Sequence, residues 1–184
     1  KALYKYQTDF TMLNADVRKE ITNTGVVLEK YGVSNEQYAK GVQMATKMLG
    51  VTAREVDDEM RGLTAHAQDI GVAPQELMAS FDQARGSIAK LGKDGVKAFK
   101  DLAITSKITG LEMEKILRMT NKFDTFEGAA EQAGKLNAAL GGNFVNALGM
   151  MMETDPNARF EMIRDAITNA GLSFDTMSYY QKNF

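Results

Sequence analysis

The amino-acid sequence predicts an all-α protein, a compact multi-helix bundle of about eight to ten short helices joined by glycine-containing capped turns. Three observations lead to this prediction. A glycine-centred phrase recurs along the chain, and the apolar residues between its copies follow the period of a helix. No stretch alternates apolar and polar residues in the way that a half-buried strand does.

The recurring phrase is interpreted as a junction between two helices. It reads YGVSNEQY at 31–38, LGVTAREV at 49–56, IGVAPQEL at 70–77, TGLEMEKI at 109–116 and AGLSFDTM at 170–177. The glycine ends one helix with a positive φ, and a cap residue or a helix-initiating proline then starts the next. Only the fourth copy has a poor cap, because Glu112 replaces the expected Ser or Thr. The predicted junction residues are Gly32, Ser34, Gln37, Gly50, Thr52, Glu55, Gly71, Pro74, Gly171 and Ser173.

Helical spacing predicts the elements between the junctions. A stripe that starts at Tyr38 continues through Val42 to Met48, and a second one at 96–103 follows the turn GKDG at 92–95. Asp155 caps a third helix that Pro156 opens and whose apolar residues continue to Ala170.

The domain organisation is predicted to be a single all-α region over 1–184, with a possible subdivision near 92–95 or 121–125. The glycines of the phrase fall at 32, 50, 71, 110 and 171, and the unequal intervals between them indicate no solenoid with a fixed period. The chain begins without Met and ends abruptly, so we expect it to be a fragment of a longer protein.

Composition excludes several classes of protein. Hydrophobic residues make up 44% and charged residues 25%, as in ordinary globular proteins. The net charge of −2 does not indicate nucleic acid or anionic lipid as a partner. The absence of cysteine excludes disulfides and thiolate chemistry, and it fits an intracellular or virion protein.

A DNA-binding helix-turn-helix, or another regulatory helical module, is the alternative interpretation. Ala67, Gly71, Val72 and Leu77 have the spacing of that motif's turn. A recognition helix needs cations for phosphates, however, and the helix after Gly71 offers mainly glutamine and acidic residues. We therefore expect no specific nucleic-acid recognition.

The sequence offers no catalytic or metal-binding constellation. Asp57, Asp58 and Glu59 are consecutive and are expected to form a solvated helix face, and His66 is the only histidine. Lys90, Lys93, Lys97 and Lys100 make the most basic patch, which is also expected to be solvated. No phosphate-binding, zinc-protease or hydrolase motif is found, so we predict no enzyme, no cofactor and no metal.

The segment 136–152, LNAALGGNFVNALGMMM, carries no charged side chain along its whole length. Its asparagines and glycines make a membrane span a poor interpretation. Buried helices broken at Gly141–Gly142 fit better, and the methionines suit a surface that repacks against partners. We therefore expect a partner-contact or conformational-switch segment, with Leu136, Leu140, Phe144, Leu148, Met151 and Met152 as the contact residues.

Several phrases resemble tail tape measure proteins of tailed bacteriophages. They are KFDTFEGAAEQAGKLNAALGGNFVNAL, TDPNARFEMIRDAI, AGLSFDTMSYYQKNF, AFKDLAITSKITGLEMEKIL and LGVTAREVDDEMRGLTAHAQDIGVAP, which together cover most of the chain. The resemblance implies a non-enzymatic structural protein that sets tail length, in the host cytoplasm during assembly and then in the virion tail. It implies self-association and contacts with other tail or baseplate proteins, with membrane contact unlikely for this segment. The repeated glycine stops favour a folded module over a continuous rod.

Overall fold

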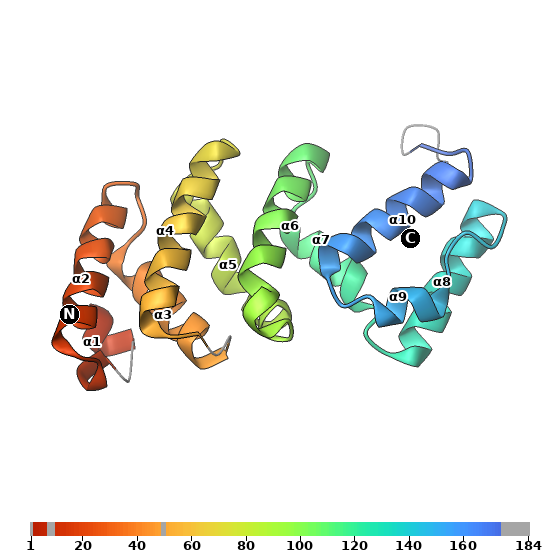
Figure 1. Ribbon diagram of the computed structural model, residues 1–184. Helices are drawn as coiled ribbons and strands as arrows, with labels where there is room; N and C mark the ends of the chain where they lie inside the picture. The colour runs from red at the N-terminus through yellow and green to blue at the C-terminus, as the bar shows by residue number, and fades with distance from the viewer. Residues whose placement is uncertain (1, 7–9, 49–50, 174–184) are drawn as a thin grey trace. The chain divides into compact units, whose positions relative to one another are not determined.

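The computed structural model describes residues 2–6, 10–48 and 51–173, and every regular element in this part of the chain is a helix (Figure 1). The all-α prediction is confirmed, with ten α-helices and two short 3-10 helices among the described residues. The chain divides into two compact units, Lys1–Glu114 and Lys115–Phe184. The expected subdivision points lie inside these units, at a 3-10 helix (Gly92–Asp94) and at the link after α7.

The first unit contains α1 to α6 in two layers. These helices are α1 (Ala2–Tyr6), α2 (Ala15–Glu29), α3 (Asn35–Met48), α4 (Ala53–Asp69), α5 (Pro74–Ala89) and α6 (Gly95–Thr109). Contacts link α1 to α3 and α3 to α5 in one layer, and α2 to α4 and α4 to α6 in the other. Figure 1 shows α2, α4 and α6 side by side, with α3 and α5 behind them. Successive helix pairs are therefore stacked as in a solenoid.

A fixed period underlies this stacking, so the expectation of no fixed period is wrong for the first unit. Gly32, Gly71 and Gly110 are equally spaced, since 71 − 32 and 110 − 71 both equal 39, and each has a positive φ just after a helix of the α2, α4, α6 layer. The buried positions repeat with the same spacing: Ile21, Thr24, Gly25 and Leu28 in α2, Met60, Leu63, Thr64 and Ala67 in α4, and Phe99, Leu102 and Ala103 in α6. The period was hidden because the junctions at Gly50 and 92–95, which join one helix pair to the next, differ in length and sequence.

The other layer follows the same register. Tyr38, Ala39, Val42 and Ala45 of α3 are buried, and so are the residues 39 positions later in α5, which are Leu77, Met78, Phe81 and Ala84. Each helix therefore repeats the inward-facing positions of the helix two before it. Because each helix pair buries its apolar face against its neighbours, the repeats stabilise one another.

The second unit contains most of α7 (Met113–Asn121), then α8 (Phe126–Leu140), α9 (Ala147–Met152) and α10 (Pro156–Asn169). α8 and α9 pack against each other, and α10 supplies Ile163 and Ala166 to a shared core. The core residues are Phe123, Ala129, Ala133, Leu140, Val145, Met150, Ile163 and Ala166. Alanine is the most frequent residue among them, so α8 lies close to its neighbours.

Candidate functional site

The predicted junction glycines adopt the left-handed conformation that ends a helix. Gly32, Gly71 and Gly171 have φ values of 82°, 66° and 72°. At each, the amide of the next residue donates to the carbonyl five residues back, as Val33 N donates to Leu28 O at 3.2 Å. This bond satisfies a carbonyl at the helix end that would otherwise lack a partner. The phrase is therefore helix-ending geometry at these positions.

The cap residues start the following helices. The Ser34 amide donates to Gln37 Oε1 at 2.9 Å, and the Gln37 amide donates to Ser34 Oγ at 3.1 Å. Thr52 and Glu55 form the same reciprocal pair at the start of α4, and the hydrogen bonds from Thr52 hold the pKa of Glu55 below its usual value. Pro74 is the first residue of α5. Gly50 lies outside the described residues, and so does the helix that Ser173 was expected to cap.

Asp57 is buried, which corrects the prediction that residues 57–59 form a solvated face. Its carboxylate is 0% exposed and accepts hydrogen bonds from Thr24 Oγ1 at 2.9 Å and from Tyr38 Oη at 2.5 Å. The Arg61 guanidinium lies 2.7 Å from Oδ2 and supplies the opposite charge. Burial, followed by the hydrogen bond to Asp57, raises the pKa of the Tyr38 phenol far above its usual value. One carboxylate thus joins α2, α3 and α4.

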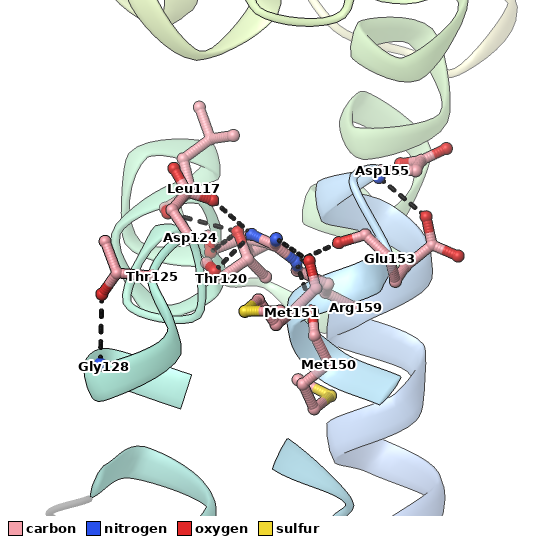
Figure 2. Close-up of polar contacts among 11 residues, drawn as sticks. Leu117, Thr120, Asp124, Thr125, Gly128, Met150, Met151, Glu153, Asp155 and Arg159 are labelled. Atoms are coloured by element: carbon pink, nitrogen blue, oxygen red, sulfur yellow. Dashed lines mark hydrogen bonds and ion pairs between the residues drawn. The ribbon is translucent and has the colours of Figure 1, made fainter. Parts of the chain in front are cut away.

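Arg159 is the corresponding polar centre of the second unit (Figure 2). Its side chain is 4% exposed and donates to the carbonyls of Thr120, Met150 and Glu153 at 2.9, 2.9 and 2.5 Å. It also pairs with Asp124 at 2.5 Å. These carbonyls end α7 and α9, where the helix dipole favours a positive charge. The guanidinium of α10 therefore caps two other helices.

Both polar centres are closed to ligands, because the chain's own groups occupy their bonding directions. Sequence reasoning missed Thr24, Arg159 and Asp124 as members of these centres. One signal was present for Asp57, since a shift of 39 positions aligns it with Val96, a buried apolar residue. For Arg159 the signal was the helical period, because it lies on the apolar stripe of α10 with Pro156 and Ile163, whereas the exposed Arg164 lies outside that stripe.

The predicted contact segment 136–152 is partly core and partly surface. Gly141, with a φ of 76°, breaks it as expected, and Asn137 holds the loop by accepting from the amides of Phe144 and Val145. Leu140 lies in the core, which removes it from any surface of the folded unit. Leu136 and Met151 are half-buried against that core. Phe144, Leu148 and Met152 remain exposed, at 38%, 54% and 71%.

A small hollow lies beside this segment in the second unit. Phe123 and Ile163 are its buried lining, Met119 and Leu136 its half-buried walls, and Lys122, Gln132 and Lys135 complete it. Its free space of about 40 Å³ holds about three water molecules and is far too small for a cofactor or nucleotide. Its size suits one aliphatic side chain.

The remaining candidates have structural partners. His66 contacts the Lys100 carbonyl at 3.1 Å, and Lys100 pairs with Glu59 at 3.1 Å. Lys97 pairs with Asp101 on its own helix. The contacts of Lys100 tie α4 to α6, and the two ion pairs neutralise Lys97 and Lys100 of the lysine patch.

The helix-turn-helix alternative also gains no support from the surface of α5. Among its exposed side chains are Gln75, Glu76, Gln83 and Arg85, and the cation Arg85 lies 3.6 Å from Asp82. A helix of this composition does not supply the excess of cations that phosphate contacts need.

Within residues 2–6, 10–48 and 51–173, no group of acidic or histidine side chains is arranged to hold a metal ion. In the same ranges, no helix is both long and apolar enough to cross a membrane. Comparison of the chain with protein-family models, curated proteins and solved structures finds no match.

Proposed function

We propose that this chain is a non-enzymatic, protein-binding segment of a tail tape measure protein from a tailed bacteriophage. The resemblance of its phrases supports the tail assignment, and the stacked helix pairs of the first unit support the protein-binding role. Stacked pairs create an extended surface that scales with the number of repeats, which suits contacts with other proteins. The partners we propose are other copies of the chain and other tail or baseplate proteins, in the host cytoplasm and then in the virion.

The observation that carries the protein-binding role is that, among the described residues, the two buried charged side chains are bonded within their own units, while large apolar side chains are exposed. The buried charges Asp57 and Arg159 are bonded to neighbouring helices of their own unit. Apolar side chains such as Met152 remain at the surface. Such a molecule offers surfaces for partners and little chemistry for substrates.

Deletion in the parent gene tests the tail assignment. If these 184 residues form stretched helix in a length ruler, their in-frame removal shortens tails by about 280 Å at 1.5 Å per residue. Removal of Val33–Gly71 alone, which is one complete repeat, shortens them by about 59 Å. Electron microscopy of the tails measures both lengths.

The two deletions also separate the possible outcomes. Shortening in proportion to the residues removed supports a ruler. Tails of normal length in both mutants support a folded module with a different role in the tail. A parent gene whose complete removal leaves normal tails overturns the tail assignment.

A further inference from the structure

The outer surface of α2 and α4 carries the most regular charge pattern of the first unit. Lys19 of α2 and Lys30 at its C-terminal end are exposed, and the residues 39 positions later in α4 are the exposed acids Asp58 and Asp69. On both helices the two charges are 11 positions apart, or about 16 Å along the axis. Within the described part of the chain, none of these four side chains forms an ion pair. At these two heights opposite charges therefore lie on neighbouring helices, whereas the exposed counterparts Asp16 and Glu55, one turn earlier, are acidic on both.

Exposed apolar residues lie beside these charged positions. Glu20 and Thr24 of α2 bond to Arg54 and Asp57 of α4, which identifies the side of α2 that faces α4. Val27 and Tyr31 continue that side by one and two turns and are 49% and 45% exposed. Val26, 54% exposed, stands next to them, and its counterpart in α4 is the exposed Ala65.

Tyr4 of α1 and Met12 of the 3-10 helix Phe10–Met12 are exposed at the N-terminal end of the unit, and beyond them the apolar exposure lies in one layer. Among the described residues between Ala15 and Glu114, the exposed large apolar ones all belong to α2, to the turn after it, or to α6. The described parts of α3 and α5 contribute none. The outer face of the α2, α4, α6 layer is therefore the face that is suited to contact another protein.

We propose that this face binds the same face of a second copy of the chain, with a two-fold axis parallel to α2 and α4 and running between them. Rotation about this axis places α2 of one copy opposite α4 of the other at the same height. Lys19 then faces Asp58 of the second copy, and Lys30 faces Asp69. Val27 and Tyr31 lie on the axis and meet their own counterparts, so an aromatic and apolar centre is surrounded by charge pairs.

The repeat is what makes the surface self-complementary. Because α2 and α4 are related by the period of the array, equivalent positions lie at the same height, and at 19/58 and 30/69 their charges are opposite. A second copy carries the matching charges on its own α2 and α4, whereas a foreign partner would need to present opposite charges at the same spacing. The dimer rests on the self-association proposed above and names its surface, and it is tested in the purified chain, where no tail is required.

A charge-swap experiment tests the dimer. Sedimentation velocity of the purified 184-residue chain over a range of concentrations up to millimolar measures self-association. The wild-type chain is expected to dimerise, and more weakly at high salt, because exposed charge pairs are screened. Lys30→Glu and Asp69→Lys each place like charges opposite one another twice per dimer. Each is expected to weaken dimerisation about tenfold or more.

Mixing the two variants is the decisive measurement. Glu at 30 then faces Lys at 69 on one side of the axis, and Asp69 faces Lys30 on the other, so a mixed dimer forms at close to the wild-type affinity. Native mass spectrometry distinguishes it from either homodimer. Lys40→Glu on α3 is the control, because Lys40 is exposed in the other layer, and it leaves dimerisation unchanged.

The inference is overturned if the wild-type chain stays monomeric at every concentration measured, since this face then does not bind a second copy. It is also overturned if Lys30→Glu dimerises as the wild type does, or if the mixture forms no mixed dimer. Circular dichroism of each variant confirms that the fold is retained, as expected for exposed substitutions. None of these outcomes depends on tail length, so failure of the dimer and failure of the tail assignment are distinguishable.

Discussion

Replacement of Arg159 is expected to unfold the second unit selectively. Its guanidinium donates to three helix-end carbonyls at 2.9 Å or less and pairs with Asp124, and its side chain is only 4% exposed. Arg159→Met fills much of the volume but leaves those acceptors without a donor. Loss of one partner from a buried ion pair costs about 3–5 kcal/mol, and each unsatisfied buried carbonyl adds about 1–3 kcal/mol.

We therefore expect a loss of at least about 4 kcal/mol, which is a large part of the total stability of a unit this small. Arg159→Lys keeps the charge but has three donors on a single nitrogen, so it cannot span the ends of α7 and α9. An intermediate loss of about 2 kcal/mol is expected for it. Arg164→Met is the matched control, because Arg164 lies on the same helix, is 50% exposed and pairs with Glu161. Its loss should be below about 0.5 kcal/mol.

Hydrogen exchange measured by mass spectrometry separates the two units, which a single spectroscopic transition does not. In Arg159→Met, amide protection should fall in peptides from 115–173 and remain unchanged in those from α2 to α5. Urea unfolding then gives the free energies. Equal stability of Arg159→Met and the wild type would refute the argument that this side chain holds α7, α9 and α10 together.

Three further predictions concern the first unit. Because the pKa of Tyr38 is raised in the folded protein, its phenol stays neutral there while the same phenol in the unfolded chain ionises above about pH 10. The free energy of unfolding therefore falls by about 1.4 kcal/mol per pH unit above that value. Urea titrations from about pH 8 to about pH 12 should show this loss in the wild type and a flatter profile in Tyr38→Phe. Asp57→Ala leaves the buried hydroxyls of Thr24 and Tyr38 without an acceptor and should cost about 3 kcal/mol. The triple variant Thr24→Leu, Tyr38→Leu and Asp57→Val installs the residues found 39 positions later. It should be neutral or stabilising in thermal unfolding. Gly71→Ala should cost about 1 kcal/mol because of its φ of 66°, while Gly86→Ala, inside α5 with open space around it, should gain about 0.5 kcal/mol in the same assay.

The helices and their ends were predictable from the sequence because they depend on local interactions. Ser34 and Gln37 stand three positions apart, so their reciprocal hydrogen bonds follow from spacing alone. The glycine stops follow in the same way from the cost of a positive φ for any other residue.

The partners of the buried charges were not predictable, because they are distant in the chain. Asp57 bonds to a threonine 33 residues away, and Arg159 bonds to a carbonyl 39 residues away. Such contacts depend on which helices stack against each other. The stacking follows from the 39-residue period, which is visible in the spacing of Gly32, Gly71 and Gly110. Comparing Gly32 directly with Gly71 and Gly110 would have placed Asp57 at a buried position.

The period of the first unit also determines how the length of this protein can change. A tandem duplication of the codons for Val33–Gly71 adds one helix pair, and it creates no new junction, since Gly71 would precede Val33 as it now precedes Val72. Insertions of other lengths within a helix place inward-facing residues on the wrong side of that helix. Variation in length is thus expected in whole repeats, so the array can grow or shrink by recombination between its own copies without redesign of its core.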